Sequence, residues 1–244
     1  MNLRLRLEIL EDAAAVARRA ASLIEERLRN AVIERGKATF AVSGGRTPAS
    51  MLRALAREDL AWEHLDLFQV DERAAPRGHP ERNAAAIRSA FATRLELHPE
   101  RFHWMPVEQP DLAAGARAYE DTLRSIAGQP AVLDLVQLGL GEDGHTASIF
   151  PAAPAQDAAT DVTLAAAHGG WRRMTLTMPA INRARFIVWV VTGSAKREVL
   201  GGLLAGDPGL VASRVRRTDV AIIADPDAAP PNVRSSRHSY GGST

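Results

Sequence analysis

The chain has 244 residues, 46% of them hydrophobic, and a formal net charge of +1. Such a balanced charge gives no reason to expect nucleic acid or an acidic membrane as a partner, because both require a concentrated basic face. The absence of cysteine excludes disulfides, thiolate metal sites and cysteine nucleophiles. We predict a cytoplasmic protein, since residues 1–10 lack the apolar core of a signal peptide and no apolar run approaches the ~18 residues of a membrane span.

The first half of the chain alternates between helical and strand patterns. Apolar residues recur four apart between residues 11 and 34, the spacing of one helix face, and Gly36 follows as a C-terminal cap. Thr47 and Pro48 have the chemistry of a helix start, with a hydroxyl N-cap and a proline at the first helical position. The other elements predicted up to residue 126 are strands over 39–42 and 65–70, a polar loop over 71–80, and helices over 83–95 and 112–126.

The second half continues this alternation. Its predicted elements are strands over 132–137, 174–178, 186–192 and 220–224 and a helix over 195–204. The pattern predicts an α/β fold, a three-layer sandwich with a mostly parallel sheet covered by helices on both faces. No repeat or linker interrupts residues 1–225, so we expect one domain there. From residue 226 the composition shifts to proline, serine, glycine and arginine, and we expect 226–244 to be a disordered tail without function.

The first candidate loop is Ser43-Gly44-Gly45-Arg46-Thr47-Pro48, between a strand and a helix. Glycines at a helix N-terminus expose backbone N–H groups at the positive end of the helix dipole, which suits an anion. A tight turn without a ligand is the alternative, because many such turns contain glycine. The segment is not a Walker loop, since no Gly-Lys-Ser/Thr follows at the required spacing. Residues 43–47 are therefore candidates for phosphate binding.

The second candidate loop, Asp71-Glu72-Arg73, directly follows the strand over 65–70. Charged groups at the carboxyl end of a strand are well placed for catalysis and equally well placed as a solvated loop. We take Asp71 and Arg73 as candidate catalytic residues.

The third and most informative loop is the run from Leu138 to Pro151, LGLGEDGHTASIFP, after a buried strand. Histidine exchanges protons readily near neutral pH, so His145 is the candidate base, although a histidine that only caps a short helix is the alternative. Gly141 and Gly144 let the backbone approach a substrate closely. Gly139-x-Gly141-x-x-Gly144 also matches the dinucleotide fingerprint, but prolines at 151 and 154 interrupt the helix that a nucleotide-binding unit requires.

Two later segments can complete a site for an anion. Arg172 and Arg173 precede the strand over 174–178, and Lys196 follows Thr192-Gly193-Ser194. Taken singly each is ordinary surface charge, but a cation beside a helix N-terminus suits a phosphate monoester. We name Arg173 and Lys196 as candidates, while the strand register, which the sequence leaves open, decides between Arg173 and Arg172.

Together these motifs resemble the 6-phosphogluconolactonase family, within the glucosamine/galactosamine-6-phosphate isomerase superfamily. The matching segments follow the family's order over about residues 10–225, and the run from Gly141 to Pro151 is specific. One departure is Gly78-His79-Pro80-Glu81-Arg82-Asn83, which lacks the family's aspartate and serine but keeps Asn83. The resemblance implies a Rossmann-like three-layer fold similar to that of glucosamine-6-phosphate deaminase, with no metal or organic cofactor. It also implies hydrolysis of a small phosphorylated sugar lactone, 6-phospho-D-glucono-1,5-lactone, to 6-phospho-D-gluconate in the oxidative pentose phosphate pathway. The oligomeric state stays open.

The resemblance leads to a hypothesis for the mechanism. His145 accepts a proton from the water that attacks the lactone carbonyl, and Asp143 fixes the tautomer of the imidazole. Arg73 polarises the carbonyl or stabilises the oxyanion. The expected phosphate contacts are Gly44, Gly45, Arg46, Arg173 and Lys196.

Two other functions remain as alternatives. A glucosamine-6-phosphate deaminase or isomerase shares Asp71 and the Asp-Gly-His triplet, but it needs an acidic residue where this chain has Phe150. A sugar-phosphate sensor that binds without turnover usually carries a DNA-binding helix-turn-helix. We expect no room for one, because the region before the strand over 39–42 is predicted to be a single helix.

Overall fold

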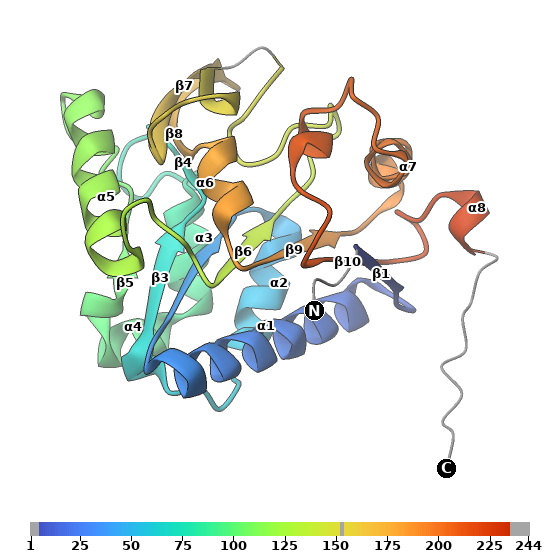
Figure 1. The fold of residues 1–244 in the computed structure, drawn as a ribbon, viewed down its shortest axis with the longest axis horizontal. Coiled ribbons are helices and arrows are strands. Elements are labelled where there is room, and N and C mark those ends of the chain that lie inside the picture. Colours follow the sequence, from blue (N-terminus) through green and yellow to red (C-terminus); the bar gives the residue numbers. More distant parts are fainter. Residues whose placement is uncertain (1–4, 152–153, 235–244) are drawn as a thin grey trace.

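Two β-sheets form the framework of the described residues, 5–151 and 154–234, in this computed structural model (Figure 1). The larger sheet has seven strands in the order β1-β10-β9-β6-β2-β3-β5, and all neighbouring pairs are parallel. Its strands are β1 (Arg6–Ile9), β2 (Ala38–Val42), β3 (Leu65–Gln69), β5 (Phe102–His103), β6 (Leu135–Leu138), β9 (Phe186–Val191) and β10 (Val220–Ala224). The smaller sheet is antiparallel and consists of β4 (Asp71–Arg73), β8 (Trp171–Leu176) and β7 (Val162–His168).

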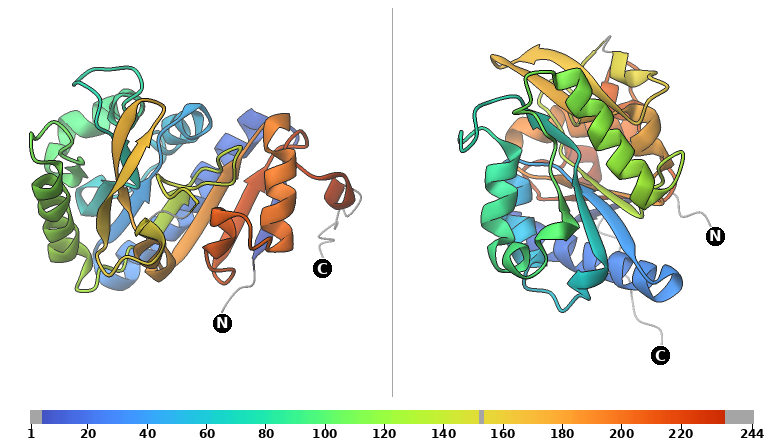
Figure 2. Two further views of the ribbon diagram at one scale, coloured as in Figure 1. Left: turned by 90° about the horizontal axis from the view of Figure 1, so that it is seen from above. Right: turned by 90° about the vertical axis from the view of Figure 1, so that its left-hand side faces the viewer.

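Helices cover the large sheet on both faces. The α-helices of the described part are α1 (Ala13–Arg35), α2 (Arg46–Leu55), α3 (Asn83–Ala90), α4 (Ala92–Leu97), α5 (Leu112–Ala127), α6 (Met178–Arg183), α7 (Arg197–Ala205) and α8 (Pro231–Arg234). In Figure 2, α1 and α5 lie on opposite sides of the strands. The predicted α/β class with a mostly parallel sheet is confirmed.

Two hydrophobic cores result from the alternation of side chains along each buried strand. In β9, Ile187, Trp189 and Val191 pack into the core that also contains side chains of α5, α6, α7 and the small sheet. Val188 and Val190 point the other way, into the core built with α1, α2 and α3. Because both faces are buried, the strand is apolar throughout, as expected of a parallel sheet between helical layers.

Glycine caps decide where two of the helices begin or end. The predicted cap Gly36 has φ +74° and closes α1 by donating its N–H to the carbonyl of Val32 over 2.8 Å. The predicted start of α2 is wrong, because the helix begins at Arg46 after Gly45, which has φ +107°. The hydroxyl of Thr47, expected to cap this helix, instead contacts the Thr192 hydroxyl over 2.8 Å.

Several predicted boundaries differ from those of the structure. The chain segment before β2 is not a single helix, since β1 precedes α1 and pairs with β10. Residues 71–73 form the strand β4 rather than part of a loop, because they pair with β8. The helix predicted over 83–95 is interrupted at Phe91, where φ is −106° and ψ is 22°, so that α3 and α4 are separate. The strand β7 was not predicted.

The prediction of a disordered tail from residue 226 onward is wrong for residues 226–234. Ala228 and Ala229 are fully buried, and α8 follows them. The carboxylate of Asp225, at the end of β10, accepts the N–H groups of Ala228 over 2.8 Å and of Gly193 over 3.0 Å. Residues 226–234 therefore belong to the folded part, and 235–244 lie outside the described residues. None of the helices in the described part combines the length and apolar character needed to cross a bilayer.

Candidate active site

A cleft of about 650 Å³ opens at the carboxyl ends of β2, β6 and β9. The chain runs from β2 outward to β3 and later crosses to β6 on the other side, so the strand order reverses at β2. Such a reversal separates the loops of neighbouring strands and leaves a crevice, which is where ligands bind in open α/β sheets. Predicted site residues that line the cleft are Ser43, Gly44, Gly45, Thr47, Asp71, Arg73, Gly141, His145, Arg173 and Lys196.

Two other predicted residues, Asp143 and Gly144, do not line the cleft directly. Asp143 lies behind His145 and contacts it. Gly144 has φ +80° and faces Leu210, because a Cβ there would overlap that leucine's side chain. Arg46 opens α2, but its side chain lies outside the part that the structure describes.

The glycine loop after β2 is held by a glutamine in the neighbouring strand. The backbone N–H of Ser43 donates to Oε1 of Gln137 over 3.0 Å, and its hydroxyl donates to the Gln137 carbonyl over 3.2 Å. Gly44 approaches Asn83 so closely that an added Cβ would overlap the Asn83 side chain. The loop thus leads into α2 with Gly44 and Gly45 lining the cleft, and a helix N-terminus at this place suits an anion.

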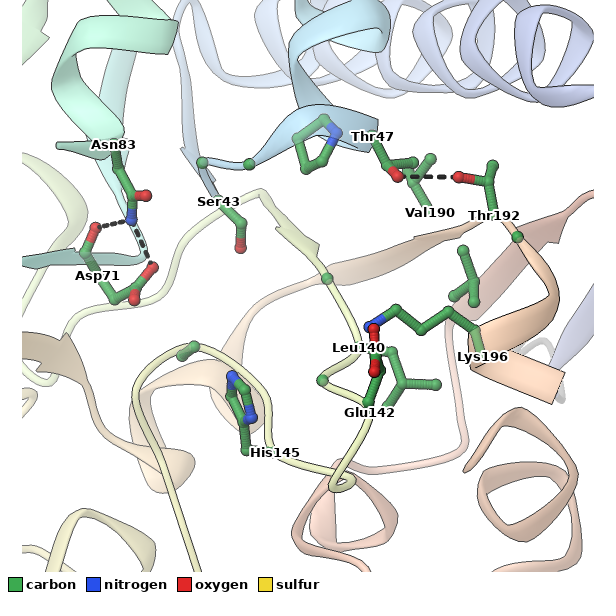
Figure 3. A pocket seen from close by; sticks show the side chains of 18 of the residues that line it. Ser43, Thr47, Asp71, Asn83, Leu140, Glu142, His145, Val190, Thr192 and Lys196 are labelled. Atoms are coloured by element: carbon green, nitrogen blue, oxygen red, sulfur yellow. Dashed lines mark hydrogen bonds and ion pairs between the residues drawn. The ribbon is translucent and has the colours of Figure 1, made fainter. Parts of the chain in front are cut away.

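Lys196 forms an ion pair across the cleft. Its Nζ lies 3.6 Å from Oε1 of Glu142, which follows β6, as Figure 3 shows. The Lys196 side chain is 24% exposed and that of Glu142 is 70% exposed. A solvent-exposed pair of this kind is weak, so an incoming anion can displace the Glu142 carboxylate.

The register of the small sheet answers the question that the sequence leaves open between Arg172 and Arg173. Arg73 of β4 lies directly opposite Arg173 of β8, and Asp71 lies opposite Thr175. Residues directly opposite one another in an antiparallel pair project from the same face. Arg173 therefore shares the cleft face with Arg73, and Arg172 projects to the other side.

Asp71 is buried, and each of its two carboxyl oxygens accepts a side-chain hydrogen bond. Its Oδ1 accepts Nδ2 of Asn83 over 3.0 Å, and its Oδ2 accepts the hydroxyl of Ser148 over 2.6 Å. Nη1 of Arg173 lies 3.9 Å from Oδ2. Burial raises the pKa of Asp71 above its usual value, although the Ser148 hydroxyl and the charge of Arg173 lower it in part. The carboxyl group thus ties together residues from β4, α3, β8 and the loop after β6.

His145 is oriented by Asp143. Nδ1 of the imidazole hydrogen-bonds Oδ1 of Asp143, and the His145 backbone N–H also donates to this oxygen over 3.2 Å. Burial acts to raise the pKa of Asp143, but the hydrogen bonds from His145 outweigh it, so this pKa is lowered. An ionised carboxylate at Nδ1 places the proton there and leaves the Nε2 lone pair free. A Cβ at Gly141 would overlap both His145 and Asp143, so this position requires glycine.

An aromatic group lies beside the imidazole. The ring of Phe150 is 4.8 Å from that of His145, between ring centroids, and stacks on His168 at 4.3 Å. The guanidinium of Arg173 lies 5.7 Å from the centre of the Phe150 ring. An apolar ring therefore lies against one side of the imidazole.

The side chains fall into two groups across the cleft. Figure 3 shows Asp71 with Asn83 on one side and Lys196 with Glu142 on the other, with Ser43 and His145 between them. One end of a ligand can thus meet a lysine and a helix N-terminus while the other end meets the imidazole and two arginines.

Sequence reasoning assigned no role to several residues that build this site, namely Gln137, Glu142, Ser148, Asn83 and Glu72. Glu142 and Ser148 lie inside the long motif, but nothing in the sequence places them against Lys196 and Asp71. Gln137 is a polar residue within an apolar strand, which is a usable signal because a buried amide needs hydrogen-bond partners. Glu72 is fully buried and accepts backbone N–H groups at the start of α3, a contact that only the fold creates.

Comparison with known sequences identifies the family. A family model described as glucosamine-6-phosphate isomerases/6-phosphogluconolactonase matches residues 11–223. The chain belongs to this family. A 6-phosphogluconolactonase of Synechocystis sp. is 36% identical over 203 residues, which cover 82% of this chain and 85% of the relative. The 6-phosphogluconolactonase of Mycobacterium tuberculosis is 32% identical over 238 residues, which cover 91% of this chain and 96% of the relative.

Solved structures of family members have the same fold. The 6-phosphogluconolactonase of Thermotoga maritima superposes with a TM-score of 0.81 at 25% identity, covering 91% of this chain and 99% of that one. The Trypanosoma cruzi enzyme of the same name gives 0.82 at 27% identity, covering 93% and 97%. A monomeric glucosamine-6-phosphate deaminase gives 0.80 at 19% identity, covering 91% and 98%, which confirms the predicted likeness in fold.

Proposed function

We propose that the protein hydrolyses 6-phospho-D-glucono-1,5-lactone to 6-phospho-D-gluconate, the second step of the oxidative pentose phosphate pathway. The observation that carries this proposal is the His145 imidazole in the cleft, held by Asp143 at Nδ1. Relatives named 6-phosphogluconolactonase over most of the chain support the same substrate. We also propose a cytoplasmic location, which a chain without cysteine fits.

The phosphate of the substrate is assigned to the end of the cleft near Lys196. The Gly44-Gly45 turn supplies backbone N–H groups at the N-terminus of α2, and Lys196 supplies a full positive charge. The phosphate takes the place of the Glu142 carboxylate beside Lys196. The contact between Thr47 and Thr192 keeps the two sides of this pocket together.

His145 acts as the general base in this proposal. Its Nε2 removes a proton from a water molecule while the water oxygen bonds to C1 of the lactone and the carbonyl electrons move onto the carbonyl oxygen. The carbonyl then re-forms, the bond between C1 and the ring oxygen breaks, and the imidazolium returns the proton to the departing alkoxide. Asp143 stabilises the imidazolium between these steps, as the carboxylate of a catalytic triad does.

Arg73 is assigned to the developing negative charge on the carbonyl oxygen. Its Nη1 donates to Oδ1 of Asn83 over 3.1 Å and to the Glu81 carbonyl over 2.5 Å, which fixes the guanidinium at the cleft wall. Arg173, directly opposite, adds a second positive charge on this face. A positioned donor at an oxyanion contributes about 3 kcal/mol in comparable sites.

We assign Asp71, a predicted catalytic residue, a positioning role. Each of its oxygens accepts a hydrogen bond, one from Asn83 and one from Ser148, so the carboxyl group is held in place by residues of the site. Through Asn83 it holds Arg73, and through Ser148 it holds the loop that carries His145.

The alternative function is deamination or isomerisation of glucosamine 6-phosphate. The shared fold and Asp71 favour it equally, but Phe150 against His145 leaves no carboxylate at that side of the imidazole. Release of ammonia from glucosamine 6-phosphate, measured with the purified protein, distinguishes the two reactions.

The decisive experiment follows the decay of freshly generated 6-phosphogluconolactone with and without the purified protein. We expect acceleration over spontaneous hydrolysis that is lost in His145→Ala, with the fold checked by circular dichroism. No acceleration by the wild-type protein would refute the proposed reaction and leave the deaminase or a sensor. Full activity in His145→Ala would refute the assigned base while retaining the reaction.

A further inference from the structure

A second cleft lies at the opposite ends of the strands of the large sheet. Its volume is about 690 Å³, close to that of the first. Residues of α1 and of the segments that lead into β6, β9 and β10 line it, so it sits at the amino ends of these strands. β9 joins the two clefts, since Phe186 lines the second and Val191 the first, about 17 Å apart along the strand.

Positive charge is concentrated in this second cleft. Five arginines and three carboxylates line it, in a chain whose formal net charge is only +1. One of the carboxylates, Asp134, is already shared by Arg35 at 2.9 Å and Arg185 at 3.2 Å. It also accepts the backbone N–H and hydroxyl of Thr39, so its oxygens are fully used. A further lining arginine, Arg183, is paired with Asp161 outside the cleft, so the charge left without a paired carboxylate is mainly that of Arg27.

Arg27, from α1, carries much of this unpaired charge. Its guanidinium lies 4.1 Å from the centre of the Phe186 ring, at the start of β9. Among the described residues it has no carboxylate within ion-pair distance, and its Nε is buried without a hydrogen-bond partner. Stacking on an aromatic ring fixes the position of a guanidinium without using its N–H donors.

Arg216 approaches the same place from the other side. Its Nη2 donates to the carbonyl of Arg185 over 2.8 Å, and its Nε is also buried without a hydrogen-bond partner. Burial lowers the pKa of Arg216, although the charge of Asp219 raises it in part. Arg27 and Arg216 thus flank residues 185 and 186, each fixed by a contact that leaves donors unused.

We propose that the second cleft binds a small phosphorylated anion between Arg27 and Arg216. The planar guanidinium presents paired N–H donors that match two phosphate oxygens, and the cleft concentrates the field of several such groups. The anion supplies the counter-charge that Arg27 lacks among the described residues. This site is independent of the lactone reaction, because none of its residues lines the first cleft.

Titration with inorganic pyrophosphate, followed by isothermal calorimetry at low ionic strength, tests the proposal. We expect two sites on the wild-type chain, because pyrophosphate also fits the phosphate pocket at Lys196. Lys196→Ala removes the first and retains the second. Arg27→Gln weakens the second about tenfold or more, since it removes a charge-assisted hydrogen bond. Arg18→Gln, an exposed arginine of α1 outside the cleft, is the matched control and leaves both sites intact.

Two results would overturn the proposal. One is the absence of any pyrophosphate binding to Lys196→Ala. The other is an equal affinity of the second site for pyrophosphate in the Arg27→Gln and Arg18→Gln chains. Arg27→Gln is preferred to a change at Arg216, because Arg216 holds the carbonyl of Arg185 and a loss of fold there would mimic a loss of binding. Since calorimetry requires no turnover, failure here is distinguishable from failure of the proposed lactonase reaction, which the decay assay reports separately.

Discussion

Replacement of Glu142 by glutamine should tighten binding of the phosphorylated substrate. In the structure, Oε1 of Glu142 lies 3.6 Å from Nζ of Lys196, at the place assigned to the substrate phosphate. The substrate must therefore displace one anion from Lys196 and then bind beside it. Glu142→Gln keeps the size of the side chain and removes the competing charge.

The magnitude follows from the exposure of the pair. With Glu142 70% exposed and Lys196 24% exposed, water screens most of the attraction. Ion pairs of this kind contribute about 0.2–1 kcal/mol. Loss of this competition lowers KM by about 1.4- to 5-fold. The value of kcat stays nearly constant, because the carboxylate touches no atom that reacts.

Steady-state kinetics with 6-phosphogluconolactone and with unphosphorylated glucono-1,5-lactone measure this effect. The lower KM should appear only with the phosphorylated substrate. Glu198→Gln is the matched control, because Glu198 lies two residues from Lys196 and is exposed, yet forms no ion pair with it among the described residues. An unchanged or higher KM in Glu142→Gln, or the same decrease in Glu198→Gln, would refute the assigned phosphate pocket.

Three further variants test the positions of other groups. Asp143→Asn should lower kcat by about 10²- to 10⁴-fold with little effect on KM, because an amide at Nδ1 of His145 permits the wrong tautomer; a wild-type kcat would contradict this orienting role. The pKa of Asp143 is lowered in the folded state, so its ionised carboxylate stabilises the fold above the usual aspartate pKa. This stabilisation is lost as the pH falls through the pKa of Asp143 in the folded protein. The urea midpoints of the wild type and of Asp143→Asn should therefore converge at low pH. Gly141→Ala should abolish most activity while Gly139→Ala retains far more, since a Cβ overlaps the imidazole at the first position and meets nothing within 4 Å at the second; equal losses would show that the overlap is relieved cheaply. Asp225→Asn should raise KM and speed proteolysis near α8, because the carboxylate binds both Gly193, in the turn before Lys196, and Ala228. Thermal denaturation should show a loss of about 1–3 kcal/mol in the free energy of unfolding. An unaltered KM would show that this carboxylate has no part in substrate binding.

The central strands of the larger sheet could be predicted because they are buried on both faces, whereas the edge strands β1 and β5 were not predicted. Residues 186–191, FIVWVV, are apolar throughout, and such a run between helical patterns indicates a parallel strand. The small sheet could not be predicted in the same way. Residues 71–73 are charged, and they become a strand only through pairing with β8, whose position the sequence does not give. A signal for β7 was present in Gly169-Gly170, a two-residue turn with positive φ at both positions that joins β7 to β8.

The site could be predicted where the motif itself brings residues together. His145 and Asp143 are two residues apart, so their contact is local and the spacing indicates it. Contacts between distant segments are different in kind. The bond between Ser148 and Asp71 spans 77 residues, and the pair of Lys196 with Glu142 depends on how β6 and β9 align. The choice between Arg172 and Arg173 likewise needed a strand register, which local sequence does not determine.

The pairing of β1 with β10 has a consequence for how the chain matures during synthesis. These two strands are separated by more than 200 residues, yet β1 has no other neighbour in the sheet as described. Until the ribosome has released residues 220–224, β9 is the open edge of the nascent sheet and β1 has nothing to pair with. An unpaired parallel edge recruits foreign strands readily. Translation that stalls between β9 and β10 would therefore leave a product prone to aggregate, even though the glycine loop, the histidine and the lysine had all been synthesised.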